Sequence, residues 1–255
     1  MLLAIDAGNT DVVFGLHSQE NWQYQWRISS QKNYNLEQFH KKLYDYLFEA
    51  DIQPQSIDRM ILSSVVPDLN PVLISLCQTL FNQAPIVLGP TTYTSLDLAI
   101  NHPDEIGADL VANAVAAWNM YEDYCIVVDF GTALTFTTIA PKAKVLGVTI
   151  APGLKTAMGA LFSNTAQLME VPLEIPKTAI GKDTVHALQS GILLGYVGLV
   201  ESLLNRIQAE VGHRCRIIAT GGLSSVLTPL HHKFDRVDRS LTLEGLRIIA
   251  EKYEG

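Results

Sequence analysis

Two stretches of this sequence decide its fold. Residues 2–16 read LLAIDAGNTDVVFGL, and residues 125–139 read CIVVDFGTALTFTTI. Each begins as a short apolar run, passes through Asp-x-Gly and a small polar residue, and continues as a second apolar run. The runs are too short and too rich in β-branched residues for helices, so each stretch predicts a strand-turn-strand hairpin.

The two hairpins are similar in sequence and form an internal repeat. Strand-like and helix-like segments alternate in the same order after each hairpin, which predicts an α/β architecture of two similar halves, residues 1–115 and 116–255. The period is too long for a solenoid repeat. The residues that align at one constant spacing are Asp6 with Asp129, Gly8 with Gly131 and Thr10 with Ala133.

Composition narrows the class of protein. The chain has 255 residues, 48% of them hydrophobic and 17% charged, which is typical of a folded globule. Its formal net charge of -8 disfavours a nucleic-acid partner. The first six residues lack the basic region of a signal peptide, and the longest apolar run, near residues 192–200, is shorter than the ~20 residues of a membrane-spanning helix. We therefore expect a soluble, cytoplasmic protein without a membrane partner.

The cysteines and histidines indicate no metal or disulfide framework. The three cysteines, Cys77, Cys125 and Cys215, are sparse and odd in number, and none has CxxC spacing. We expect them to be buried free thiols. The histidines form no recognisable ligand set. Neither a GxSxG elbow nor a GxxxxGK[ST] loop occurs, which disfavours serine hydrolases and P-loop kinases.

The paired Asp-x-Gly turns suggest phosphate chemistry. A glycine at a strand end lets the backbone approach a ligand, and its amide can donate to phosphate oxygens. An aspartate there can hold Mg²⁺ directly or through water. One such turn alone is usually an ordinary turn. Two of them at matching places in a duplicated fold favour a clamp on the phosphates of a nucleotide.

Three other motifs allow a functional or a purely structural interpretation. The Thr220-Gly221-Gly222 stretch follows a strand and is expected to precede a helix. Its backbone could pack closely against the adenosine of a nucleotide, or it could be a plain strand-to-helix turn. Asp109 lies at the start of a predicted helix. It could act as a general base, or it could be a carboxylate that only complements the helix dipole. The segment 180–184, IGKDT, opens a long predicted helix over 183–211 as an anion site or as an ordinary cap.

Together these motifs resemble the type III pantothenate kinases, a family of the acetate and sugar kinase/Hsp70/actin superfamily. The resemblance runs nearly from end to end. It implies a duplicated ribonuclease H-like fold of the actin and hexokinase type. Its landmarks are IDAGNTDVVFG at 5–15, SSVVP at 63–67, IGADLVANAVAA at 106–117, VVDFGTALT at 127–135, IAPGLKTAMGALFSNTAQL at 150–168, IGKDTVHALQSGILLGYVGLVE at 180–201, ATGG at 219–222 and LTLEGL at 241–246.

The resemblance implies ATP-dependent phosphorylation of the primary hydroxyl of pantothenate, the first step of coenzyme A synthesis, by a homodimer. It also implies ATP with Mg²⁺ and a monovalent cation, K⁺ or NH₄⁺, as cofactors. The residue roles that it implies are as follows: Asp6, Ala7, Gly8, Asn9, Thr10, Asp11, Val12 and Val13 for the phosphate loop, with Asp6 organising Mg²⁺; Thr132, Gly221 and Gly222 for ATP; Asp109 as proton acceptor; Asp129 for the monovalent cation; and Gly107, Ala108, Asp109, Leu110 and Thr184 for pantothenate.

The sequence departs from the family pattern mainly near the acceptor side. Leu110 stands where the family usually has arginine, which removes a guanidinium suited to an anionic substrate. The other departures are Ser95, Val148 and Asn164. Two alternatives therefore stay open at this point: a non-catalytic ATP-binding paralogue, and a kinase for another small hydroxy acid.

Overall fold

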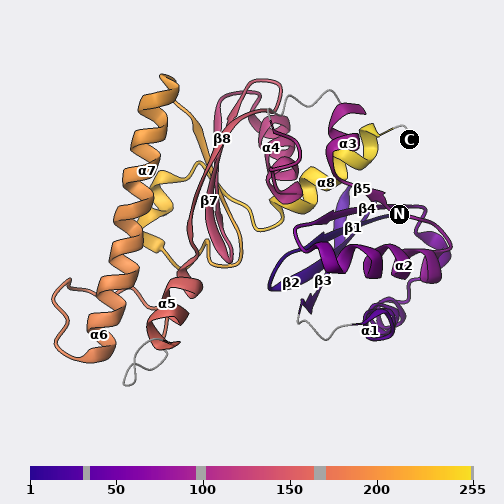
Figure 1. The fold of residues 1–255 in the computed structure, drawn as a ribbon, viewed down its shortest axis with the longest axis horizontal. Coiled ribbons are helices and arrows are strands. Elements are labelled where there is room, and N and C mark those ends of the chain that lie inside the picture. Colours follow the sequence, from indigo (N-terminus) through magenta and orange to yellow (C-terminus); the bar gives the residue numbers. More distant parts are fainter. Residues whose placement is uncertain (31–34, 96–101, 164–170, 254–255) are drawn as a thin grey trace. The chain divides into compact units, whose positions relative to one another are not determined.

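A computed structural model describes residues 1–30, 35–95, 102–163 and 171–253 of the chain. These residues form two compact units (Figure 1). The first unit comprises Met1–Ala116 together with Leu241–Gly255, and the second comprises Ala117–Ser240. The expected halves, 1–115 and 116–255, differ from these units in one respect: the C-terminal segment belongs with the first unit, because its helix packs on the first sheet.

The first unit is built on a five-stranded sheet in the order β3-β2-β1-β4-β5. Strand β1 pairs antiparallel with β2 and parallel with β4. Its residues 2–5 are buried, as expected for a central strand with both faces covered. The elements are β1 (Leu2–Ala7), β2 (Asp11–Ser18), β3 (Asn21–Ser29), α1 (Leu36–Glu49), η1 (Pro54–Ser56), β4 (Arg59–Ser64), η2 (Pro67–Leu69), α2 (Asn70–Phe81), β5 (Ile86–Val87), α3 (Pro90–Ser95), α4 (Ala108–Tyr121, which runs into the second unit) and α8 (Leu241–Lys252).

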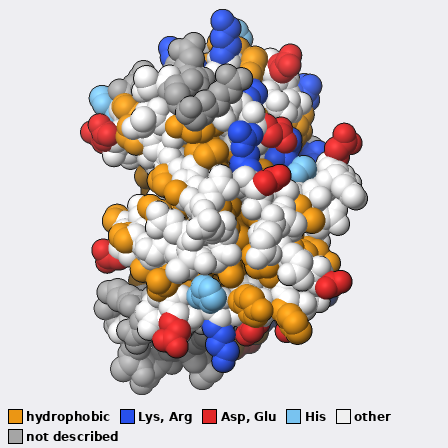
Figure 2. All heavy atoms as spheres, turned by 90° about the vertical axis from the view of Figure 1, so that its right-hand side faces the viewer, with side chains coloured by type: hydrophobic (Ala, Val, Ile, Leu, Met, Phe, Trp, Pro, Cys, Tyr) orange, Lys and Arg blue, Asp and Glu red, His pale blue; other side chains and the backbone are white. Residues whose placement is uncertain are grey.

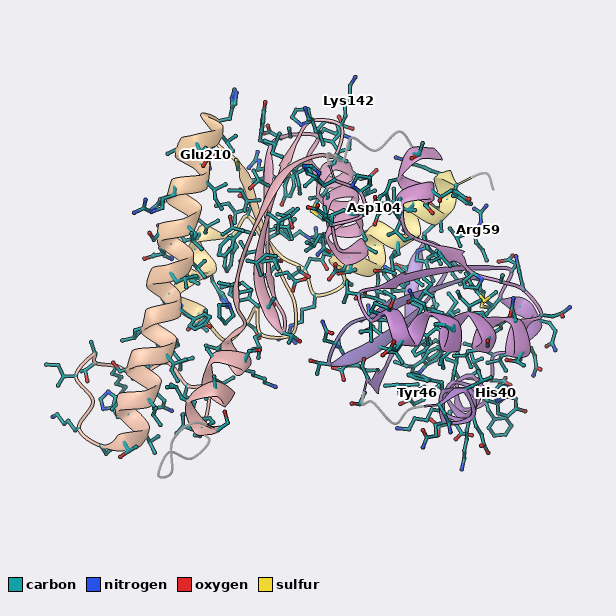
Figure 3. The ribbon with its side chains drawn as sticks, in the orientation of Figure 1. His40, Tyr46, Arg59, Asp104, Lys142 and Glu210 are labelled. Carbon is teal, nitrogen blue, oxygen red and sulfur yellow. The ribbon has the colours of Figure 1, made fainter. Side chains whose placement is uncertain are left out.

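Helix α1 shows how local sequence sets an element of this unit. Its capping box joins Asn35 and Gln38, each side chain bonding to the other residue's backbone. One face of the helix is fully buried in the core of the first unit. Figure 3 labels Tyr46 and His40 on this helix; the Tyr46 ring stacks on Trp26 of β3, with ring centroids 5.7 Å apart. The apolar spacing of this helix therefore anchors it against the sheet.

The second unit repeats the arrangement. Its sheet has the order β10-β9-β6-β7-β8, with β6 antiparallel to β7 and parallel to β9. Strand β6 is the buried central strand, as β1 is in the first unit. The elements are β6 (Cys125–Phe130), β7 (Ala133–Ala140), β8 (Lys144–Pro152), α5 (Leu154–Ser163), α6 (Thr184–Gln189), the π-turn η3 (Ser190–Leu194), α7 (Gly195–Val211), β9 (Arg216–Thr220), η4 (Thr228–Lys233) and β10 (Arg236–Val237).

The two hairpins are equivalent, but their turns differ in length. Four residues lie between the paired residues Ala7 and Val12, whereas three lie between Phe130 and Leu134. The constant spacing expected through Thr10 and Ala133 is therefore wrong beyond the turn. The equivalence of Asp6 with Asp129 precedes the extra residue and is unaffected by it.

The long helix expected over 183–211 is confirmed over Thr184–Val211, and the π-turn η3 lies within it between α6 and α7. The continuous run Thr184–Val211 has 28 residues, and an 18-residue window of it has a mean hydropathy of 1.5. It is the one helix among the described residues that is long and apolar enough to cross a membrane. Core helices of soluble proteins meet the same test, and Glu201 of this helix contacts Lys233 at 3.8 Å. Length and composition therefore assign no membrane role to it.

The surface mixes charges of both signs. Figure 2 shows acidic and basic side chains interspersed on one face of the molecule, with hydrophobic side chains exposed between them. The most exposed large hydrophobic side chains include Phe48 of α1, 76% exposed, and Ile180, 80% exposed. Scattered exposed hydrophobic residues are normal on folded proteins and assign no function by themselves.

Candidate active site

In the first unit, the phosphate-loop candidates follow β1. Asp6 is half-buried in β1, and the turn after it is closed by the Gly8 amide, which donates to the Asp11 carbonyl at 2.9 Å. The end of β3 holds the turn from the other side. The Ser30 hydroxyl donates to the Gly8 carbonyl at 2.6 Å, and the Ser30 amide donates to the Thr10 carbonyl at 2.8 Å. The loop is thus held by its neighbours.

The remaining residues of this loop divide by exposure. Asn9 and Thr10 are exposed at its tip. Ala7 and Val12 are buried, and Val13 is half-buried. The tip of the loop, rather than its flanks, therefore presents the side chains that can reach a ligand.

Asp109 lies in the first turn of α4. Its Oδ1 accepts a hydrogen bond from the Leu110 amide at 2.8 Å. A Cβ added at Gly107 would lie 2.5 Å from the same oxygen, so glycine at this position leaves room for the carboxylate. Ala108 and Leu110 on either side are buried. Burial raises the pKa of Asp109 above its ordinary value of 3.8, whereas the backbone hydrogen bonds lower it.

Asp6 and Asp109 belong to segments that meet in the first unit. The Val65 amide, just past β4, donates to the Ala7 carbonyl at 3.0 Å. The side chain of Val65 also lies 3.4 Å from the position that a Cβ at Gly107 would take. The ends of β1 and β4 and the start of α4 therefore converge.

Sequence reasoning missed Tyr93, which lies in the short helix α3. Its side chain is almost fully buried. Burial raises the pKa of Tyr93 to about 12, and the negative charge of Asp109 adds to the effect. A phenol of this kind stays neutral near pH 7. The Gly89-Pro90 pair before it was a signal for a turn, but nothing in the sequence linked Tyr93 to Asp109.

In the second unit, three loops gather around Asp129. The Asp129 carboxylate is half-buried at the end of β6, and its Oδ1 would clash with a Cβ at Gly221. Gly221 has φ +87°, a left-handed conformation that favours glycine. The Thr132 carbonyl accepts from the Gly153 amide at 3.0 Å and from the Thr156 hydroxyl at 2.7 Å. These contacts hold the turn of the second hairpin against the start of α5.

The remaining candidates lie in the same unit. Thr132 and Gly222 are exposed. The expected helix after Gly222 is wrong: a series of turns leads instead into the 3₁₀ helix η4, because a Ser224 hydroxyl bond to the Gly221 carbonyl, at 2.8 Å, closes a turn there. Thr184 is the exposed first residue of α6, and Asp183 caps this helix by accepting from the His186 amide at 2.8 Å.

The predicted site residues therefore form two groups, one in each unit. The structure brings the loop after Asp6 and the start of α4 together in the first unit, and the Asp129, Thr132 and Gly221 loops together in the second. Of the departures from the family pattern, Leu110 is buried, Val148 is half-buried in β8 and Ser95 ends α3, whereas Asn164 lies outside the described residues.

A duplicated sheet with an aspartate near the end of each central strand defines a class: the kinases and nucleotide-binding proteins of the sugar kinase and actin fold. The chain is similar in fold to an inorganic polyphosphate/ATP-glucomannokinase from Arthrobacter sp. strain KM, with a TM-score of 0.52, 12% identity and 99% coverage of both chains. It is also similar to the activator of the 2-hydroxyisocaproyl-CoA dehydratase from Clostridium difficile, solved with bound ADPNP, with a TM-score of 0.56, 13% identity and coverage of 98% of this chain and 92% of that one.

Sequence comparison gives the particular family. The model of a family described as type III pantothenate kinase matches residues 2–206. A type III pantothenate kinase from Moorella thermoacetica is 40% identical over 252 residues, which cover 99% of each chain. The chain belongs to the type III pantothenate kinase family, and it is a kinase.

Proposed function

We propose that this protein transfers the γ-phosphoryl group of ATP to the primary hydroxyl of pantothenate, as the first step of coenzyme A synthesis. The observation that carries the proposal is the family membership, with 40% identity over nearly the whole chain. The retained Asp6, Asp109 and Asp129 support it. The alternative of a non-catalytic paralogue is not favoured, because the relatives that match nearly the whole chain are named as kinases.

Asp109 is the proposed general base. Its carboxylate accepts the proton of the pantothenate hydroxyl while the hydroxyl oxygen bonds to the γ-phosphorus and the bond to the β,γ-bridging oxygen breaks, releasing ADP. Burial raises its pKa, which brings the carboxylate closer in basicity to the operating pH. A base of this kind must come within ~3 Å of the hydroxyl. We propose Gly107, Ala108, Leu110 and Thr184 as the other pantothenate contacts.

The nucleotide contacts follow from the two hairpins. We propose that the loop from Asp6 to Val13 binds the phosphates, and that Thr132, Gly221 and Gly222 contact ATP. Amides in tight turns are good phosphate donors, and phosphoryl transfer depends mainly on positioning and charge neutralisation.

The proposed cations are Mg²⁺ near Asp6 and K⁺ or NH₄⁺ near Asp129. Within the described residues there is no group of three or more His, Cys, Asp or Glu side chains that could hold a metal ion. The donor set fits Mg²⁺ held through water and nucleotide oxygens, since this ion usually keeps several waters. When bound, these ions supply positive charge that offsets the phosphate charge. We further propose a homodimer in the cytoplasm.

The test is ADP release with pantothenate and K⁺, in a coupled assay. Pantothenate is expected to accelerate ATP consumption by the wild-type protein. Asp109→Asn is expected to reduce this rate by roughly 10²–10⁴-fold, the usual contribution of a general base, with ATP binding unchanged. Asp104→Asn is the matched control, because Asp104 is exposed in the segment before α4 (Figure 3). No acceleration by pantothenate with folded wild-type protein would refute the proposal.

A further inference from the structure

Ser63 of β4 carries a buried hydroxyl that the site as described does not use. The residue is fully buried, and its Oγ has no hydrogen-bond partner among the described residues. Buried hydroxyls in folded proteins are normally bonded to protein or to ordered water. A buried hydroxyl without a hydrogen-bond partner in the protein therefore indicates an additional partner, such as an ordered water.

The register of the sheet places Ser63 beside Asp6. The two residues are paired across the parallel strands β1 and β4. Directly paired residues project their side chains from the same face of a sheet, so the hydroxyl and the carboxylate share one face. On the other side of Asp6, the paired residue is Val13 of β2, which has no donor. Of the two residues paired directly with Asp6, Ser63 is thus the one with a side-chain donor.

The second unit also has hydroxyl residues beside its aspartate. Asp129 is paired across the parallel strands β6 and β9 with Thr220, which is 2% exposed. On its other side Asp129 is paired with Thr135 of β7, whose buried Oγ1 also lacks a partner among the described residues. In both units, therefore, a buried hydroxyl residue on the adjacent parallel strand accompanies the aspartate. If these positions required only a small side chain, alanine would serve as well as serine or threonine.

Ser64, the next residue, shows a contrasting local role. Its Oγ donates to the Val66 carbonyl at 3.1 Å and accepts from the Val66 amide at 3.2 Å. These bonds close the turn after β4. The hydroxyl of Ser64 is therefore committed to the backbone, whereas that of Ser63 is not.

We propose that Ser63 is a positioning residue for Asp6, and that its hydroxyl holds an ordered water shared with the carboxylate. This water becomes part of the hydration shell of the nucleotide-bound Mg²⁺. Groups around the direct ligands of a metal commonly alter its affinity by 10–100-fold. The inference rests on the proposed function, because it assumes that a nucleotide with its divalent cation binds at the loop after Asp6.

The test measures cation binding without turnover. The affinity of Mn²⁺ for the protein–ADP complex is measured by electron paramagnetic resonance, and the affinity of ADP without a divalent ion by calorimetry. Ser63→Ala is expected to weaken Mn²⁺ binding by about 10–100-fold and to leave metal-free ADP binding unchanged. Ser64→Ala is the matched control and is expected to bind Mn²⁺ as the wild type does. Ser63→Thr keeps a hydroxyl and is expected to retain most of the affinity.

Two outcomes would overturn the inference: wild-type Mn²⁺ affinity in Ser63→Ala, whether or not its Tm is lowered, or an equal loss of affinity in Ser64→Ala. Should Ser63→Ala fail to fold, Ser63→Cys decides, because it fills the site with a weak donor and is expected to show the same loss. Failure of the wild type to bind ADP with Mn²⁺ would instead reject the proposed function, which separates the two failures.

Discussion

Gly221 is the position where a single added methyl group tests the geometry around Asp129. The residue has φ +87°, and a Cβ there would lie 2.7 Å from the backbone N and C of Phe130 and still closer to Asp129 Oδ1. A left-handed conformation costs a non-glycine residue about 1–2 kcal/mol. Overpacking against backbone that cannot move easily adds about 1–3 kcal/mol. We therefore expect Gly221→Ala to lower the free energy of unfolding by about 2–5 kcal/mol.

Two other glycines separate these contributions. Gly212, at the end of α7, has φ +72° but open space around its Cβ position, so Gly212→Ala is expected to cost about 1–2 kcal/mol from backbone strain alone. Gly222 has neither a left-handed φ nor a neighbour within 4 Å. Gly222→Ala is therefore expected to be neutral or to stabilise by about 0.4–1 kcal/mol through the unfolded state.

The assay is chemical denaturation followed by circular dichroism, together with the K⁺ dependence of ADP release. Gly221→Ala is also expected to raise the K⁺ concentration needed for half-maximal activity, because the added methyl displaces the carboxylate proposed to hold the cation. Equal stability of the Gly221→Ala and Gly222→Ala variants would refute the reasoning. A stability loss without any change in K⁺ dependence would keep the strain argument and reject the cation role of Asp129.

Three further predictions follow from burial and close packing. Burial raises the pKa of Asp109, so its ionised form weakens the fold as pH rises through that pKa; Asp109→Asn is expected to raise the Tm at pH 7 and to lose this advantage below the ordinary value of 3.8, and an unchanged Tm at pH 7 would contradict this. Gly245→Ala is expected to destabilise strongly in denaturant titrations, since its Cβ would meet the Ala112 carbonyl, and wild-type stability would reject that close approach. Burial raises the pKa of Cys77 and Cys125 to about 12, so a thiol reagent is expected to leave both unmodified in the native protein, and fast labelling would show that they are accessible.

The hairpins, the central strands and the long helix over 183–211 could be predicted because their signals are local. The apolar runs before each Asp-x-Gly predict the strands β1 and β6. The extra residue in the first turn could not be read from aligned letters, because only the strand register reveals it. The π-turn η3 and the partnership of the C-terminal helix with the first sheet depend on tertiary packing, which no local pattern encodes.

The candidate site was only partly predictable for the same reason. The aspartates stand out because Asp-x-Gly at the end of an apolar run is a local signal. Tyr93 and Ser63 are ordinary letters in the sequence, and what distinguishes them is burial beside a charge or beside a paired strand. Such neighbours are separated by tens of residues along the chain and meet only in the folded unit.

The discontinuous first unit has a consequence for synthesis on the ribosome. Helix α8 supplies buried side chains to a unit whose sheet is already translated before residue 117, so the two parts emerge on either side of the whole second unit. At bacterial or eukaryotic rates, the intervening residues 117–240 delay this helix by roughly 6–25 s. During that interval the N-terminal sheet lacks the helix that covers part of its apolar surface. The second unit can therefore finish folding before the first, which is the reverse of their order along the chain.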